Sequence, residues 1–143
     1  MTEIKISELS IGDWVFIDNT MDKSIGKIAR IHYDSALVDC GEGHYLGGYI
    51  SQIEPILLTP EILEKNGFDA PKAKVWNDSW YWSNRKDVAL ELRESFGLWY
   101  MEIVTKEQRS GLQSNRKLGI GFNYVHQLQH ALRLAGVEKE IEV

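Results

Sequence analysis

The chain has 143 residues, the size of one ordinary domain, and 43% of them are apolar, which is enough to build a core. Its formal net charge of −5 disfavours unselective binding to a phosphate backbone, because such binding needs a dense basic surface. The single cysteine, Cys40, excludes an internal disulfide and is more typical of a reducing cytosol than of a secreted protein.

The sequence shows no signal for a membrane or for secretion. No apolar run approaches the roughly 18 residues that a membrane-spanning helix needs. The opening residues MTEIKISELS lack the basic and apolar regions of a signal peptide. We therefore expect a soluble, cytoplasmic protein with a single domain over residues 1–143.

Residues 1–58 predict short strands separated by turn residues. WVFI (14–17) reads as a compact apolar strand, and the polar stretch DNTMDKS (18–24) that follows it predicts a loop. The four glycines of GEGHYLGGYI (41–50) predict a sharp bend, after which apolar residues return.

A hairpin is predicted between GKIARIHY (26–33) and ALVDC (36–40), with Asp34-Ser35 as its two-residue connection. Four or five short curved strands within 1–58 favour a small SH3-like β-barrel, since closing a sheet removes its exposed edges.

The next segment, TPEILEKNGF, carries the clearest helix signals of the chain. Thr59 can cap the first turn, and Pro60 suits the first helical position. Gly67 can adopt the left-handed conformation that ends a helix, and Phe68 would then fold back onto Leu63. A short helix of about two turns follows from this pattern.

Two β-hairpins are predicted next. KVWNDSWYW breaks at the turn residues 77–79, which pairs Val75-Trp76 with Trp80–Trp82. VALELR (88–93) alternates apolar and polar residues and is followed, after a turn, by LWYMEIV (98–104), which pairs with it.

The stretch from Thr105 to Lys117 has no periodicity and predicts an exposed loop. LGIGF (118–122) allows a last short strand. From Asn123 the apolar residues recur at helical spacing, and Gly136 is a plausible end for this closing helix.

His126 and His130 lie four residues apart, the spacing at which zinc hydrolases hold their metal. On a helical projection they fall opposite the apolar stripe that contains Leu128 and Leu132, so we expect them to face solvent. The residue beside His126 is Gln127, which cannot act as the base that a metalloprotease needs. No metal ligand and no cofactor are therefore predicted.

Other candidate chemistry is equally weak. The glycine-rich GEGHYLGG (41–48) lacks the following helix of a phosphate-binding loop and favours a barrel turn. Cys40 ends an apolar strand, where a cysteine usually serves as a small buried residue. The carboxylates Glu91, Glu94 and Glu102 lie on the predicted hairpin arms, with no sign that they converge. The sequence predicts no catalytic residues and no enzymatic activity.

An aromatic cluster is the most informative feature for function. Successive residues of a strand face opposite sides, so the rings of these hairpins cannot all enter one core. Exposed tryptophan and tyrosine dominate binding sites, and the rings then predict a surface for a protein or small ligand. The alternative is that both sheet faces are covered. The candidate residues are Trp76, Trp80, Trp82, Trp99 and Tyr100.

A second candidate is a nucleic-acid surface. The predicted loop 105–117 carries four basic residues against one acidic residue, Glu107, for a local charge of +3. In this hypothesis the basic residues contact phosphates while aromatic rings stack on bases. The four are Lys106, Arg109, Arg116 and Lys117.

Several segments resemble a family of small uncharacterised proteins of Bacteroidetes genomes and their phages or prophages. The resemblance is carried by LSIGDWV (9–15), GKIARI (26–31), IEPILLTPEILEKNGF (53–68) and NYVHQLQ (123–129), and is weak across 70–120. It implies no activity, cofactor or catalytic residue. It does imply a mobile-element context, in which a phage accessory role, including interference with host defence, is plausible.

The predicted fold is α+β, with a small N-terminal SH3-like barrel over 1–58 followed by a short helix, aromatic-rich antiparallel hairpins and a closing helix over 59–143. The predicted function is non-enzymatic binding of a protein or small ligand, such as a host defence protein or a nucleotide signal. Nucleic-acid binding through the loop 105–117 is the alternative.

Overall fold

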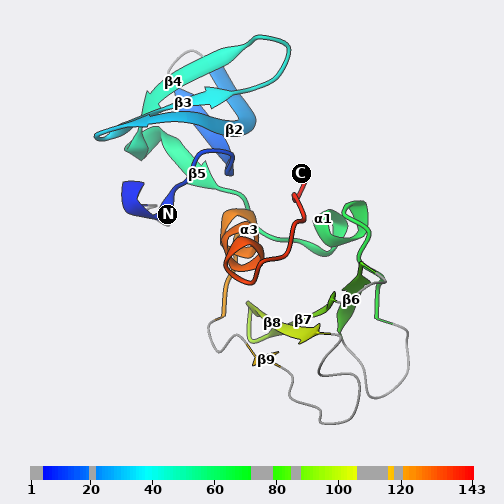
Figure 1. Cartoon of the computed structure of the whole chain (residues 1–143). Helices are drawn as coiled ribbons and strands as arrows, with labels where there is room; N and C mark the ends of the chain where they lie inside the picture. The colour runs from blue at the N-terminus through cyan, green and yellow to red at the C-terminus, as the bar shows by residue number, and fades with distance from the viewer. Residues whose placement is uncertain (1–4, 20–21, 72–78, 85–87, 106–115, 118–120) are drawn as a thin grey trace. The chain divides into compact units, whose positions relative to one another are not determined.

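A computed structural model describes residues 5–19, 22–71, 79–84, 88–105, 116–117 and 121–143 (Figure 1). The chain divides into two compact units, and each combines an early with a late stretch of sequence. The first unit is Met1–Leu57 with Tyr124–Arg133, and the second is Leu58–Asn123 with Leu134–Val143. Antiparallel sheets and α-helices make up the described residues, which confirms the predicted α+β class.

The first unit holds a five-stranded antiparallel sheet with the order β4-β3-β2-β1-β5 (Figure 1). Its elements are η1 (Ile6–Glu8), β1 (Trp14–Asn19), β2 (Asp22–His32), β3 (Ser35–Asp39), β4 (Tyr45–Tyr49), η2 (Ile50–Gln52, a 3-10 turn) and β5 (Ile53–Pro55). Within the described strands this ladder has two ends, β4 and β5, so hydrogen bonding does not close it into a barrel.

Three local predictions for this sheet were wrong in detail. The polar stretch 18–24 is mostly strand rather than loop, because Asp18 pairs with Lys23 and extends the β1–β2 hairpin. The connection between β2 and β3 is Tyr33-Asp34, one residue earlier than predicted, since His32 pairs with Ser35. The second half of 41–50 is β4 and not only a bend.

The pleat of this sheet separates a buried face from an outer face. Every second residue of β1 and β3 is buried, and these residues form the core of the unit. The core residues are Leu9, Val15, Ile17, Ile28, Ala36, Val38 and Ile53. Gly26 lies on the same face, where a Cβ atom would clash with the Asp39 carbonyl oxygen, so this position needs glycine.

In the second unit the short helix α1 (Pro60–Lys65) forms as predicted. The Thr59 hydroxyl accepts a 3.3 Å hydrogen bond from the Ile62 N–H, which satisfies a donor of the first turn. At the other end Gly67 has a φ of +82°, and the Phe68 N–H donates to the Leu63 carbonyl at 3.0 Å. These bonds are the predicted Schellman stop.

The second sheet has the order β6-β7-β8-β9. Its strands are β6 (Trp80–Ser83), β7 (Val88–Ser95), β8 (Leu98–Thr105) and β9 (Arg116–Lys117). The β7–β8 hairpin confirms the prediction for 88–104. Its turn is Phe96-Gly97, with φ of +52° and +80°, as in the type I′ turns that suit hairpins. The first arm predicted for the other hairpin, 75–76, lies outside the described residues, and β6 pairs with β7.

The C-terminal segment of the second unit is held by Asn66 at the end of α1. The Asn66 Nδ2 donates to the Glu142 carbonyl at 2.6 Å, and its Oδ1 accepts from the Glu142 N–H at 2.7 Å. Asn66 is only 9% exposed. Its neutral side-chain amide thus connects α1 to the backbone of Glu142, 76 positions later in the chain.

The last helix, α3 (Val125–Leu134), begins and ends close to the predicted limits. Gly136 follows it with a φ of +73°. The helix buries one face, as predicted, but this face is wider than the predicted stripe and includes His126 and Gln129; at 100° per residue the buried positions span about 160°. They are Val125, His126, Leu128, Gln129 and Leu132.

Candidate functional site

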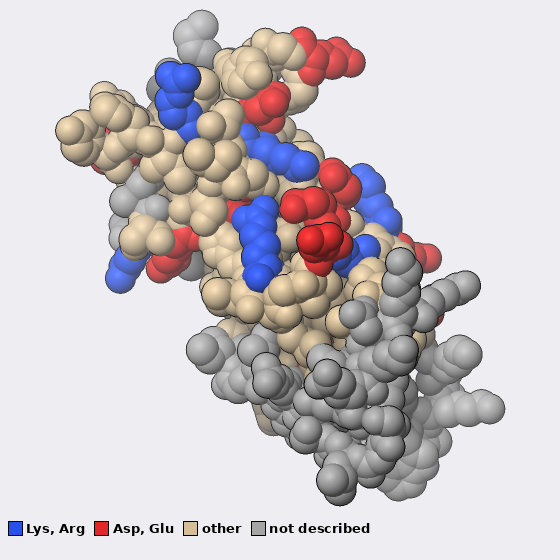
Figure 2. Space-filling view, in the orientation of Figure 1, with Lys and Arg blue, Asp and Glu red and all other residues tan. Residues whose placement is uncertain are grey.

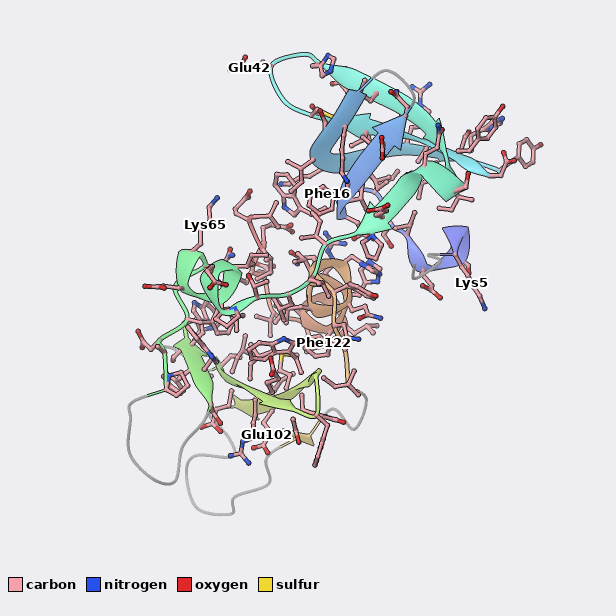
Figure 3. All side chains as sticks on the ribbon, turned by 180° about the vertical axis from the view of Figure 1, so that it is seen from behind. Lys5, Phe16, Glu42, Lys65, Glu102 and Phe122 are labelled. Atoms are coloured by element: carbon pink, nitrogen blue, oxygen red, sulfur yellow. The ribbon has the colours of Figure 1, made fainter. Side chains whose placement is uncertain are left out.

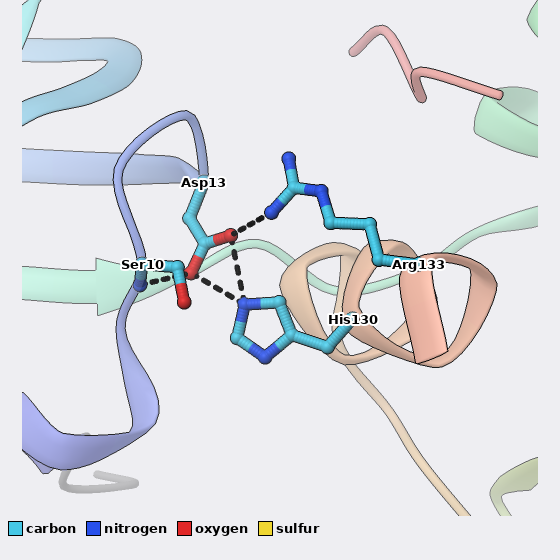
Figure 4. Close-up of polar contacts among 4 residues, drawn as sticks. All are labelled: Ser10, Asp13, His130 and Arg133. Atoms are coloured by element: carbon cyan, nitrogen blue, oxygen red, sulfur yellow. Dashed lines mark hydrogen bonds and ion pairs between the residues drawn. The ribbon is translucent and has the colours of Figure 1, made fainter. Parts of the chain in front are cut away.

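The most polar buried cluster of the first unit is centred on Asp13, in the turn before β1. Its carboxylate is fully buried and accepts a 2.7 Å bond from the Ser10 N–H. The His130 Nε2 atom, from α3, lies 2.8 Å from one carboxylate oxygen and 2.9 Å from the other (Figure 4). Arg133, one turn further along α3, places its guanidinium 3.8 Å away. The cluster therefore ties α3 to the N-terminal turn.

His126 corrects the expectation that both histidines face solvent. Its side chain is 2% exposed, its ring stacks on Tyr124, and the centroid of the His130 ring is 5.6 Å away. The buried Nδ1 atom makes no hydrogen bond. Burial lowers the pKa of His126; His130 lowers it further, whereas the negative charges of Asp13 and Glu8 oppose the shift.

The contacts of this cluster are those of a carboxylate held by an imidazole, a guanidinium and a backbone N–H. A carboxylate and an imidazole can orient a base, but a nucleophile or a metal must complete the set. Among the described residues no group of three histidine, cysteine, aspartate or glutamate side chains could hold a metal ion. We interpret the cluster as a polar clasp that holds α3 in place.

The remaining candidate carboxylates and Cys40 are located as follows. Glu91 and Glu102 stand directly opposite each other on β7 and β8, a pairing that the sequence did not indicate. Glu94 pairs across the hairpin with Trp99 and is exposed. Cys40 is half-buried, and its Sγ lies 3.8 Å from the Val38 carbonyl oxygen.

Among the described residues, the predicted binding rings of the second unit do not form one exposed surface. Trp99 is 4% exposed and its Nε1–H donates to the Leu58 carbonyl at 3.2 Å, so it is a core residue. Trp80 and Trp82 are half-buried and lie on the same sheet face as Leu90 and Leu92. Trp76 lies outside the described residues.

Two further contacts define what the second sheet exposes. The Lys139 ammonium sits 4.8 Å from the Trp82 ring centroid, and burial lowers the pKa of this lysine. Tyr100 is half-buried on the opposite face of the sheet, where Gly121 packs against its ring. Tyr81 of β6, on the same face as Tyr100, is 40% exposed.

The basic stretch predicted as a loop is only partly described. Arg116 and Lys117 belong to β9, and their backbone pairs with Ile103 and Glu102 of β8, so this end of the stretch is strand rather than loop. Lys106 and Arg109 lie outside the described residues.

The most exposed tyrosines of the described chain lie instead in the first unit. Tyr33, at the β2–β3 turn, is 83% exposed, and Tyr45 and Tyr49 of β4 are 51% and 63% exposed. The loop that leads into β4 carries the exposed Glu42, labelled in Figure 3. Sequence reasoning treated 41–50 as a glycine-rich bend; the alternation of Tyr45, Gly47 and Tyr49 was the signal that could have revealed an outward strand face.

Register places further apolar side chains beside these tyrosines on the outer face of the five-stranded sheet. Trp14, Phe16 and Leu37 alternate with the buried core residues and are half-buried. We call the set Trp14, Phe16, Leu37, Tyr45 and Tyr49 the outer aromatic face. The Lys27 ammonium lies 5.0 Å from the Trp14 ring centroid, and that of Lys23 lies 5.9 Å from Phe16.

The charges of the outer face cancel. Its strand positions carry three basic residues, Lys23, Lys27 and Arg30, against three acidic residues, Asp18, Asp39 and Glu54. On the side of the molecule seen in Figure 2, basic and acidic side chains are likewise interspersed over the described residues. This balance gives little attraction for a polyanion.

Comparison with known proteins gives no relative: no family model, no curated protein and no solved structure matches the chain. In the part of the chain that the structure describes, no helix has the length and apolarity needed to cross a membrane.

Proposed function

We propose that this protein is a non-enzymatic binding protein that recognises a protein partner through the outer aromatic face of its first unit. The observation that carries the proposal is the exposure of Tyr45 and Tyr49, at 51% and 63%, beside half-buried apolar residues. Tyrosine supplies a large contact area at a small cost in conformational entropy, and it is enriched at binding hot spots.

The charge balance of the face supports a protein as the partner. A surface without net charge gains little from a phosphate backbone or an anionic membrane. Mixed charges around apolar rings are instead the usual composition of an interface between proteins. The half-buried rings Trp80 and Trp82 are a smaller candidate surface, since Lys139 already covers Trp82.

We also propose that the first unit is an SH3-like half-barrel. The proposal is supported by the strand order, in which β5 returns beside β1 after the meander β1–β4. The far strand β4 also bends toward β1: a Cβ atom on Gly48 would lie 3.1 Å from the Ile17 Cδ1 atom.

The test compares partner capture by three purified, immobilised variants in lysate of the producing cells. The native chain and Phe96→Asn, which removes an exposed ring from the second unit, should retain the same protein. The double variant Tyr45→Ser, Tyr49→Ser should lose it while keeping the native circular-dichroism spectrum. Retention of the same protein by the double variant would refute the proposed surface.

Nucleic-acid binding is the second candidate, favoured by the cation–aromatic pairs Lys27–Trp14 and Lys23–Phe16. It predicts binding of labelled single-stranded oligonucleotide that weakens steeply as salt rises. Fluorescence anisotropy without any change at low salt would reject it. The accessory role in a phage stays a prediction that rests on the sequence resemblance.

A further inference from the structure

We propose that two copies of this chain associate by pairing their β4 strands antiparallel, which continues the five-stranded sheet across a two-fold axis at Gly47. This inference goes beyond the proposed function, because it requires no other protein. It starts from the position of β4, whose five residues form one edge of the sheet (Figure 1).

Hydrogen-bond alternation shows which backbone groups of β4 point outward. His44 and Ile50 bond toward the β3 side, through Cys40 N–H to His44 O and Ile50 N–H to Asp34 O. The odd-numbered residues between them therefore direct their N–H and C=O groups away from β3. Two side-chain contacts agree: the Tyr49 N–H donates to Gln52 Oε1 at 2.9 Å, and the Gly47 carbonyl accepts a long 3.5 Å bond from Asn19 Nδ2.

The other sheet edges of the described chain are better protected than β4, where side chains bond only the Tyr49 N–H and, at 3.5 Å, the Gly47 carbonyl among the outward backbone groups of Tyr45, Gly47 and Tyr49. The opposite edge, β5, is three residues long and contains Glu54 and Pro55, which lacks an N–H. In the second sheet β6 is bridged by Asp69, and β9 has only two residues. The sequence of β4, YLGGY, has no charge and no proline, so it offers a template for another strand.

The sequence of β4 also makes a second copy the best occupant. With Gly47 on the axis, Tyr45 of one copy lies opposite Tyr49 of the other, and each Gly47 donates its N–H to the carbonyl of the second copy. The tyrosine pairs are favourable cross-strand neighbours, and no like charges of β4 face each other.

Gly47 allows a clean test, because the site tolerates a side chain. Its φ is not positive, and an added Cβ would meet only the Leu37 Cδ1 atom, at 3.9 Å. In the dimer, Gly47→Lys places two ammonium groups side by side on the axis and should separate the copies. Gly47→Thr adds a side chain that suits strands and should leave association intact or strengthen it.

Sedimentation velocity from ~10 μM to ~1 mM suits a contact at the weak end of specific interfaces. The native chain and Gly47→Thr should form a dimer as concentration rises, whereas Gly47→Lys should remain a monomer with an unchanged circular-dichroism spectrum. Hydrogen exchange at the two concentrations should slow for the amides of Tyr45 and Gly47 but not for Tyr49, which is already bonded to Gln52.

A monomeric native chain at ~1 mM would overturn the proposal, as would a dimer that persists in Gly47→Lys. These outcomes are independent of the proposed function, because they use the purified chain alone. Partner capture lost in Tyr45→Ser, Tyr49→Ser would still support that function if no dimer forms. A dimer without any captured partner would support the self-association alone.

Discussion

The two units treat their aromatic and polar residues in opposite ways. The first unit exposes its tyrosines on β4 and buries the Asp13 carboxylate of its polar clasp, which contacts His130. The second unit buries Trp99 in its core, and the neutral amide of Asn66 holds its C-terminal segment. Aromatic content alone therefore does not identify a binding surface; the face of the pleat on which each ring lies decides its role.

The largest effect is expected at Trp99, which tests the assignment of the second unit's rings to its core. Trp99→Ala should lower the free energy of unfolding by about 3–5 kcal/mol, since it leaves a cavity and removes the bond to the Leu58 carbonyl. Urea unfolding measures this loss. A change below about 1 kcal/mol would show that Trp99 is not a core residue.

The polar clasp of the first unit comes next. Asp13→Ala should cost about 3 kcal/mol in the same measurement, because it removes the buried partner of His130 and the acceptor of the Ser10 N–H. The matched variant in the second unit is Asn66→Ala, with an expected loss of about 1–3 kcal/mol from the unsatisfied Glu142 backbone. Equal and negligible losses would contradict both assignments.

Acid should destabilise the first unit in particular, because it buries His126 beside the His130 of the polar clasp. Burial lowers the pKa of His126 from its ordinary value of 6.5, so between the two values the unfolded chain binds more protons than the folded chain. Stability from this group is complete above pH 6.5 and is lost as the pH falls through the folded pKa.

The variant His126→Phe supplies the control for this pH effect. Phenylalanine keeps a ring against Tyr124 and removes both the titration and the unbonded Nδ1. Urea unfolding between pH 7.5 and 5 should show a smaller loss of stability in the variant than in the native chain. The slopes of the free energy of unfolding against pH should differ by at most about one bound proton. Identical pH profiles would exclude His126 as the source.

A smaller and opposite effect is expected at the tip of the β7–β8 hairpin. Phe96 is fully exposed and has a φ of +52°, a conformation that asparagine adopts more easily. Phe96→Asn creates the Asn-Gly pair that type I′ turns prefer and should raise stability by about 1 kcal/mol. A lower thermal midpoint would argue against this turn assignment.

The smallest effect on stability should come from the tyrosines of β4, although they carry the proposed function. Tyr45→Ser with Tyr49→Ser should change the free energy of unfolding by less than about 1 kcal/mol, since both rings are more than half exposed. Thermal unfolding checks this. A loss as large as that of Trp99→Ala would mean that these rings support the fold and would remove the contrast between the units.

Sequence reasoning succeeded where the signal is local. The cap at Thr59, the stop at Gly67 and the hairpin over 88–104 each depend on residues within a few positions of one another, and all three form. The α+β class follows from such elements.

It failed where a distant residue decides the environment. The helical projection could not reveal that His126 is buried, because the Asp13 that binds the neighbouring His130 lies 117 residues earlier. Whether a ring is buried also depends on which sheet face becomes covered. Residue type alone could therefore not show that Trp99 is buried and Tyr49 is exposed. The strand within the polar stretch 18–24 was missed because both faces of an extended hairpin can meet solvent.

The separation of Asp13 and His130 along the chain has a consequence for biosynthesis. When β1–β5 leave the ribosome, the Asp13 carboxylate cannot yet bond to the His130 imidazole, because His130 lies 117 residues later and has not been translated. We therefore expect the nascent sheet to be less tightly packed until α3 has been translated. During that interval it would be most accessible to chaperones and proteases.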